Sequence, residues 1–387
     1  MSKDIRPFLD FYGRHSISPV AQDISDLKKH FRRRNALYQH CGIPSAWIEQ
    51  KDVLEIGPGT GHNALFTNSL KPRLYTLVDG NPKSCTTTQS LLNDFFKDTS
   101  NCEIIEKDIQ SLSLKKQYDF VISEGILPTQ KNPDLLLKTI GEYVKPGGML
   151  IITCMDSISF LSDNLRKVAA LLILDDREYS ISAKIEKLSP FFHNHIKHLP
   201  GMTRSIQDYL YDPILMPLIG RMFPIDEAIE TLSNQFEVNG SSPNFIVDWR
   251  WYKDITIKNN IHNKNAISHY RKNIHNLLDY RYNFDETSEA IGQEMLKCGN
   301  MIFEKSVRLQ KGLDRLDIQE MNNTILELNS IMANFSTSTA SGLSEFCQGV
   351  DRYLSGKPFP SSLPNFEAWW GRGTQYLSFI KNNEDWG

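Results

Sequence analysis

Residues that could hold a nucleotide gather around one glycine-rich turn in the first part of the chain. Residues 53–56 (VLEI) read as a short buried strand, and Gly57, Gly59 and Gly61 follow at alternate positions before helical spacing resumes at His62. Glycine lacks a Cβ, so such a turn lets the backbone approach a ligand closely. The succession of strand, turn and helix predicts the nucleotide-binding opening of an open α/β sheet, with the ligand beyond the carboxyl end of the strand.

The spacing of these glycines excludes two common phosphate-binding motifs. A dinucleotide fingerprint, G-x-G-x-x-G, requires glycine at position 62, where this chain has His62. A P-loop requires a Gly-Lys-Ser/Thr ending, which does not follow this turn. The pattern that remains is Glu-x-Gly-x-Gly-x-Gly, beginning at Glu55.

Further strand-like runs follow, and polar residues close several of them. These runs cover residues 74–78, 103–107, 118–123 and 149–153. Asp79 closes the first run, Asp108 the second, and Glu124 the third, whereas a Pro-Gly-Gly turn precedes the fourth. A carboxylate after such a strand can accept two hydrogen bonds from ribose hydroxyls.

These five matches, in this order over residues 50–155, resemble the class I S-adenosylmethionine-dependent methyltransferases. The resemblance implies an α/β fold: a Rossmann-like mixed seven-stranded sheet with helices on both faces, binding S-adenosyl-L-methionine. It implies that Asp79 binds the ribose and that Asp108 lies beside the adenine amino group. The residues expected around the cofactor are Glu55, Gly57, Gly59, Gly61, Asp79, Asn81, Asp108, Ile109 and Glu124.

Length and composition limit the class of protein. A chain of 387 residues has room for two domains, because single domains cluster near ~100–200 residues. The net charge of −3 argues against a nucleic-acid partner, which would require a basic face. No apolar run reaches the ~18 residues of a membrane span, and the start lacks a signal-peptide core. Six scattered cysteines without a C-x-x-C pair fit a cytoplasmic protein.

The elements that must position these residues divide the chain into three expected segments. Residues 1–49 form an N-terminal helical segment that closes on the cofactor site, with residues 11–19 expected to line it. Within it, the basic run 28–34 (KKHFRRR) reads as a solvated helix face, although a phosphate-bearing acceptor could also use it. Ser25 is the expected cap of that helix, and Asn132-Pro133 reads as the start of another.

The methyltransferase domain is expected over residues 50–260, with an acceptor-site insertion at about 175–235. Its last two strands are expected at 236–238 and 245–255, separated by a turn at 240–243. Residues 261–387 show helical periodicity and predict an α-helical C-terminal region, with a small-residue linker at 336–342. This region could also form a homodimer interface.

The chemistry expected at the acceptor follows from the cofactor. Methyl transfer is an in-line displacement, so the protein mainly positions the reactants and manages the proton of the acceptor. Enzymes of this family that methylate the amino groups of DNA bases or glutamine carry Asp/Asn-Pro-Pro-Tyr after strand 4, whereas residues 123–128 read SEGILP. We therefore expect methylation of a small-molecule or saccharide acceptor at oxygen.

A base near the acceptor would assist methylation of a hydroxyl. His195 is the expected base, because a neutral imidazole can accept a proton near pH 7, and Glu124 is the second candidate. His193, His195 and His198 do not show convincing metal-ligand spacing, so no metal is expected. Two alternatives stay open: a cofactor-binding scaffold without transferase activity, and a nicotinamide-dependent dehydrogenase, which His62 opposes.

Overall fold

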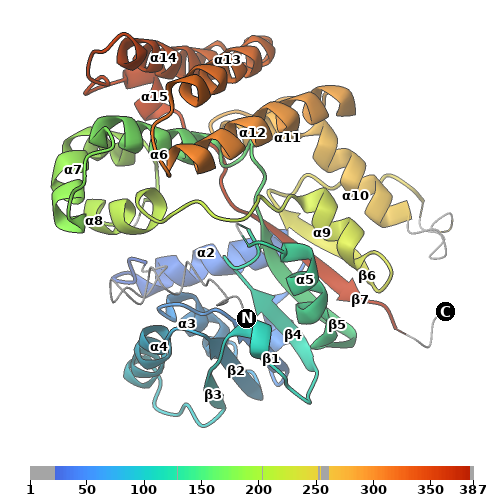
Figure 1. Cartoon of the computed structure of the whole chain (residues 1–387). Helices are drawn as coiled ribbons and strands as arrows, with labels where there is room; N and C mark the ends of the chain where they lie inside the picture. Colours follow the sequence, from blue (N-terminus) through green and yellow to red (C-terminus); the bar gives the residue numbers. More distant parts are fainter. Residues whose placement is uncertain (1–21, 129, 203, 252, 254–260, 384–387) are drawn as a thin grey trace, which may run out of the picture. The chain divides into compact units, whose positions relative to one another are not determined.

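The computed structural model describes residues 22–128, 130–202, 204–251, 253 and 261–383. The chain forms two compact units (Figure 1). The first comprises the described residues of 1–154, 223–270 and 374–387, and the second those of 155–222 and 271–373. Residues 11–19, expected to line the cofactor site, lie outside the described residues.

A seven-stranded sheet forms the centre of the first unit. Its strands are β1 (Asp52–Ile56), β2 (Leu74–Asp79), β3 (Cys102–Glu106), β4 (Tyr118–Ser123), β5 (Val144–Cys154), β6 (Phe236–Ser242) and β7 (Gln375–Lys381). They lie in the order β3-β2-β1-β4-β5-β7-β6. The first five strands are parallel, and β7 is antiparallel to both of its neighbours. This arrangement confirms the mixed seven-stranded sheet that the sequence predicts.

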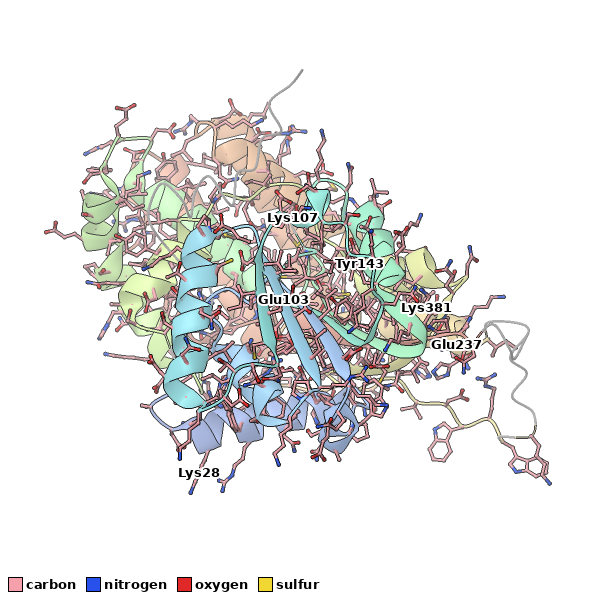
Figure 2. The ribbon with its side chains drawn as sticks, turned by 90° about the horizontal axis from the view of Figure 1, so that it is seen from below. Lys28, Glu103, Lys107, Tyr143, Glu237 and Lys381 are labelled. Carbon is pink, nitrogen blue, oxygen red and sulfur yellow. The ribbon has the colours of Figure 1, made fainter. Side chains whose placement is uncertain are left out.

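Helices of the first unit cover both faces of the sheet. They are α2 (Leu27–His40), α3 (His62–Ser69), α4 (Pro82–Phe95), α5 (Pro133–Glu142), α9 (Ile225–Leu232) and α10 (Ile261–Lys272), with short 3₁₀ turns at Ser45–Ile48 and Ile109–Ser111. Right-handed crossovers put α3 and α4 on one face and α5 on the other, because the strand order reverses direction at β1. Glu103 and Lys107 mark the outer edge of the sheet at β3 (Figure 2).

The apolar core under α2 and α3 is built from residues far apart in the sequence. Tyr38 of α2, Phe66 of α3 and Phe120 of β4 are all buried. The Tyr38 ring packs edge-on against Phe66 and Phe120, with centroids 5.4 Å and 5.9 Å away. Such aromatic pairs add to the free energy of area burial. The core therefore fixes α2 and α3 against the strands whose ends carry the glycine turn.

Helix starts follow the local sequence closely. Pro133 opens α5 after Asn132, as predicted. The cap of α2 is Asp26 rather than the expected Ser25, and its Oδ1 accepts a hydrogen bond from the Lys29 N–H at 2.9 Å. Both residue types cap helices well, so the expected start was one position early.

The last two strands differ from the prediction. Strand β6 runs on through residues 240–242, where a turn was expected, and β7 comes from Gln375–Lys381 instead of 245–255. Residues 244–251 form no strand, and Trp249 is 93% exposed. An alternating aromatic pattern is a weak strand signal when no neighbouring strand pairs with it. The seven residues of β7 lacked a distinctive pattern beside the longer helical segments before them.

The second unit is helical throughout its described residues. It contains α6 (Leu161–Leu174), α7 (Ile181–Lys197), α8 (Ile206–Tyr209), a π-helical turn (Leu210–Ile214), α11 (Ile274–Leu277), α12 (Glu289–Leu309), α13 (Arg315–Met332), α14 (Thr337–Leu354) and α15 (Pro364–Ala368). The helical C-terminal region is thus confirmed for the helices between residues 261 and 368, whereas residues 375–381, also expected to be helical, form β7. The expected boundaries at residues 49 and 261 do not coincide with the compact units, because residues 155–222 pack with 271–373.

The expected small-residue linker at 336–342 is instead the first part of α14. Ser336 caps the helix, and its Oγ accepts a hydrogen bond from the Thr339 N–H at 3.2 Å. Gly342 is needed for packing, because a Cβ at that position would lie 3.1 Å from the carbonyl oxygen of Asn365. Small residues at 336–342 therefore serve a cap and a close helix contact, and they do not form a linker.

Candidate functional site

The turn after β1 is built as the sequence predicts, from three glycines with positive φ. The φ angles are +74° at Gly57, +59° at Gly59 and +79° at Gly61. A Cβ at position 57 would lie 2.5 Å from Cδ1 of Ile126, and one at position 61 would lie 2.8 Å from Oγ1 of Thr88. The backbone conformation and the packing of the protein itself therefore both require glycine here.

Asp79 ties the glycine turn to the end of β2. Its Oδ2 accepts a hydrogen bond from the Gly59 N–H at 3.1 Å, and its Oδ1 accepts one from the Asn81 N–H at 2.8 Å. A carboxylate offers about four acceptor positions, so both oxygens can still accept hydrogen bonds from two ribose hydroxyls. Burial raises the pKa of Asp79 above its ordinary value, which two backbone donors partly offset. Asp79 therefore keeps free acceptor positions at the end of β2, where the ribose contacts are expected.

Asn81, Asp108 and Ile109 lie just beyond β2 and β3. Asn81 caps α4 by accepting a hydrogen bond from the Lys83 N–H at 3.1 Å. Asp108 caps the short turn Ile109–Ser111, and its Oδ1 accepts from the Gln110 N–H at 2.8 Å. Both residues follow parallel strands at the same edge of the sheet as the glycine turn. The structure therefore places these predicted residues in one region.

Glu55 is a buried carboxyl group on β1. It is 5% exposed, and the Tyr75 hydroxyl donates a hydrogen bond to its Oε2. Burial, and secondarily the charge of Glu124, raises the pKa of Glu55 to about 7. A carboxyl group in this state can change its protonation near neutral pH.

Glu124, after β4, forms an ion pair with Arg34 of α2. The guanidinium Nη1 and Nη2 lie 2.9 Å and 2.6 Å from Oε2 and Oε1, and the two side chains are 7% and 11% exposed. Asn63 Nδ2 donates a further hydrogen bond to Oε2 at 3.3 Å. A two-point ion pair of this kind holds helix and strand in a fixed register.

Arg34 was not predicted as a site residue, because it belongs to the basic run 28–34, which was interpreted as a solvated helix face. That interpretation holds for Lys28, which lies on the outer side of α2 (Figure 2), and for Arg32 and Arg33. His30, Arg34 and Tyr38, however, are buried on one side of the helix. Their spacing of four residues was the available signal, since residues four apart share a helix face.

A second missed feature is the contact network of His62, at the position that excludes a dinucleotide fingerprint. Its Nδ1 accepts a hydrogen bond from the Gln22 N–H at 2.7 Å, and its carbonyl oxygen lies 3.0 Å from Nε2 of His30. Burial lowers the pKa of His62. This residue thus holds the first described residues of the chain against the start of α3.

Known proteins that resemble this chain are methyltransferases. A family model described as a methyltransferase domain matches residues 25–179. A malonyl-[acyl-carrier protein] O-methyltransferase of Calditerrivibrio nitroreducens is 26% identical over 188 residues, covering 47% of this chain and 69% of the relative. This match supports the predicted resemblance of residues 25–179 to the class I S-adenosylmethionine-dependent methyltransferases. The nicotinamide-dependent dehydrogenase is not supported by this match.

Solved methyltransferase structures also resemble this chain. The N-methyltransferase NodS of Bradyrhizobium japonicum, in complex with S-adenosyl-L-homocysteine, aligns with a TM-score of 0.27 and 17% identity, covering 33% of this chain and 62% of that chain. PKMT2 of Rickettsia typhi, in complex with AdoHcy, aligns with a TM-score of 0.43 and 16% identity, covering 61% of this chain and 48% of that chain. The aligned part is less than two thirds of each solved chain.

His195, the expected base of this methyltransferase, lies in the interior of the second unit. Its side chain is 0% exposed, and its ring lies 4.5 Å from Phe191 and 5.4 Å from Phe366. The Arg166 Nε–H donates a hydrogen bond to Nδ1 at 3.1 Å. Burial, together with the charge of Arg166, holds the pKa of His195 well below its ordinary range. These surroundings indicate a structural role, because an acceptor has no access to a fully buried imidazole.

The other polar residues of the insertion are not gathered into a metal site. His193 and His198 are exposed, on either side of the buried His195. Arg204 pairs with Asp212 at 2.5 Å between Nη1 and Oδ2. Among the described residues, no group of three or more His, Cys, Asp or Glu side chains could hold a metal ion. In the same described part of the chain, no helix is long and apolar enough to cross a membrane.

Proposed function

We propose that this methyltransferase transfers the methyl group of S-adenosylmethionine to an oxygen atom of a small-molecule or saccharide acceptor. The observation that carries the proposal is the loop after β4, where residues 123–128 (SEGILP) replace the Asp/Asn-Pro-Pro-Tyr of base and amide methylases. The relative from Calditerrivibrio nitroreducens, named as an O-methyltransferase, supports oxygen as the acceptor atom.

The residues proposed to hold the cofactor follow the ends of β1 to β4. Asp79 would bind the ribose hydroxyls, since each of its oxygens accepts one backbone N–H and has capacity left. Asp108, with Ile109, would lie at the adenine. Glu55 and the turn glycines at 57, 59 and 61 would surround the methionine part. Asn81 and Glu124 complete the proposed set.

The bound cofactor supplies a methyl group already activated on a sulfonium. The protein then has to orient the reactants and keep them apart from water. The ion pair of Arg34 and Glu124 would fix α2 beside the end of β4, so Arg34 would act as a positioning residue. Glu124 remains the better placed of the two proposed bases, because it follows a strand end in the methyltransferase unit and His195 is enclosed by aromatic rings.

The two kinds of oxygen acceptor, a carboxyl group and a hydroxyl group, give methylated products that differ in their stability to alkali. Methylation of a carboxyl oxygen gives an ester, which alkali hydrolyses to methanol, whereas methylation of a hydroxyl gives an ether that alkali leaves intact. The malonyl-[acyl-carrier protein] relative points to the first product and the saccharide proposal to the second. An N-methyl product also survives alkali. It is distinguished from the ether by identification of the methylated atom, which is nitrogen and not oxygen.

The experiment is transfer of a labelled methyl group from S-adenosylmethionine into fractions of small molecules and saccharides, followed by alkaline treatment and identification of the methylated atom. The Asp79→Ala variant serves as the negative control, because it removes the proposed ribose contacts. Label on oxygen supports the proposal. Label on nitrogen would refute it, and no transfer into any fraction would favour the cofactor-binding scaffold.

A further inference from the structure

A basic cleft of about 630 Å³ lies within the second unit. It is formed by the end of α6, by α7, by the start of α13 and by the loop after α14. Its charged lining consists of four cations, Arg177, Lys187, Arg315 and Lys357, and one acid, Asp175. Clefts lined by one sign of charge concentrate ions of the opposite sign. All of the lining residues belong to the second unit.

The two lysines of the basic cleft have no acidic partner among the described residues. Lys187 lies over the ring of Tyr179, with Nζ 5.5 Å from the centroid. Lys357 sits in the loop after α14, beside Gly356, whose φ is +83°. Both ammonium groups are on exposed side chains and are free to turn toward a ligand.

The single acid of the basic cleft is already engaged. Asp175 Oδ1 accepts a hydrogen bond from the Tyr353 hydroxyl at 2.6 Å, and its Oδ2 lies 3.7 Å from the Arg177 guanidinium. Asp176, the next residue, accepts a hydrogen bond from the Leu313 N–H at 2.7 Å. Asp175 and Asp176 both have left-handed backbone, with φ of +55° and +52°. Asp175 is the C-cap of α6, so this left-handed backbone ends the helix at the rim of the cleft.

We propose that the basic cleft binds a small organic molecule that carries two or more phosphate charges. Arg315 donates one hydrogen bond to the carbonyl oxygen of Leu354 and retains further N–H groups for an anion. Leu172, Pro358 and Phe359 supply apolar surface for the organic part of the ligand. The volume lies within the ~300–1,000 Å³ usual for small-molecule sites and far exceeds a phosphate ion. This proposal does not depend on the identity of the methyl acceptor.

Calorimetry of the full chain tests the proposal. The protein is first saturated with S-adenosylhomocysteine, so that a nucleotide probe cannot occupy the cofactor site. Guanosine diphosphate and fructose 1,6-bisphosphate are then titrated, with guanosine and fructose as the matched neutral compounds. We expect at least one phosphate compound to bind, its affinity to fall as salt rises, and its neutral partner not to bind. Absence of binding by both phosphate compounds at millimolar concentration would overturn the proposal.

A pair of variants assigns any binding to the basic cleft. Lys187→Gln combined with Lys357→Gln removes two charges from exposed side chains and should weaken the phosphate compound about tenfold or more. Lys297→Gln, an exposed lysine of α12 outside the cleft, is the matched control and should change the affinity less than about twofold. Unchanged helical circular dichroism and thermal unfolding verify that the double variant is folded, because the second unit is helical throughout its described residues. Equal phosphate affinity in the double variant and in the control would place the binding elsewhere and refute this assignment.

Discussion

Arg34 and Glu124 lie 90 positions apart in the chain, and their side chains meet in two hydrogen bonds of 2.9 Å and 2.6 Å. This contact joins the helix before the sheet to the loop after β4. Burial of both groups makes the pair costly to break, because either partner alone would be a charge without a counter-charge. A single substitution in this pair should therefore reveal how far the stability of the cofactor region depends on α2.

Arg34→Met should lower the free energy of unfolding by about 3–5 kcal/mol, since it leaves Glu124 buried and unpaired. The matched control is Arg33→Met on the exposed side of the same helix, which should change stability by less than about 0.5 kcal/mol. Urea denaturation measures both variants. Equal stabilities of the two variants would show that the ion pair adds nothing to the fold.

Asp79→Ala should weaken binding of S-adenosylhomocysteine, because the proposed ribose contacts are charge-assisted hydrogen bonds of roughly 1.5–3 kcal/mol each. Part of any loss will come from the turn, which Asp79 stabilises through the Gly59 N–H. Asp94→Ala on the exposed side of α4 is the control and should leave affinity unchanged. Calorimetry that finds a loss below threefold in Asp79→Ala would remove Asp79 from the ribose site.

Glu55 should make the stability of the cofactor-free protein depend on pH. Its folded-state pKa of about 7 lies above the ordinary value of 4.5, so the folded state holds the proton more tightly. Stability attributable to Glu55 is then full below about pH 4.5 and is lost as the pH rises through 7, by roughly 3 kcal/mol. Glu55→Gln cannot titrate, so it should gain stability relative to the wild type between pH 5 and pH 8. Parallel stability curves for the two proteins would contradict the raised pKa.

Gly61→Ala tests how much of the glycine requirement comes from packing. The variant must adopt a φ of +79° and place its Cβ near Thr88, so it should lose more than the ~1–3 kcal/mol that left-handed backbone alone costs. Gly356→Ala is the matched control, because Gly356 also has left-handed φ but a Cβ there has open space. Thermal denaturation of the two variants should separate the steric contribution. A smaller loss in Gly61→Ala than in Gly356→Ala would argue against the contact with Thr88.

His195→Ala distinguishes the structural role of this residue from the catalytic one. Removing a fully buried ring that accepts a hydrogen bond from Arg166 should destabilise the protein by about 2–5 kcal/mol. Turnover per folded molecule should stay within about twofold of the wild type, as it should in the control His193→Ala, which changes an exposed residue of the same helix. A tenfold or greater loss of turnover in folded His195→Ala would restore the assignment as general base.

The part of the fold that local sequence determines was the part that could be predicted. The glycines at 57, 59 and 61 and the acid at 79 lie where their spacing indicates, because each follows the end of a parallel strand. β7 could not be predicted in the same way, since its place between β5 and β6 depends on pairing over more than 130 residues of sequence. Tertiary contacts of that kind leave little trace in a seven-residue segment.

The candidate site was predicted incompletely for a related reason. The sequence pattern gives the residue types at strand ends but not their partners from other elements. Arg34 was assigned to a charge run, although burial of His30, Arg34 and Tyr38 on one side of α2 makes it the counter-ion of Glu124. His195 was predicted as the base from the ordinary pKa of histidine. In the folded protein, burial among aromatic rings lowers the pKa of His195.

The position of β7 determines when the sheet can be completed during synthesis of the chain. β6 forms its described pairing with β7 alone, so the strand at Phe236–Ser242 has no sheet partner until Gln375–Lys381 has left the ribosome. At roughly 5–20 residues per second, more than a hundred residues of synthesis separate the two strands. During that interval the edge of β5 carries unpaired backbone groups, the kind of surface to which other nascent chains and chaperones bind.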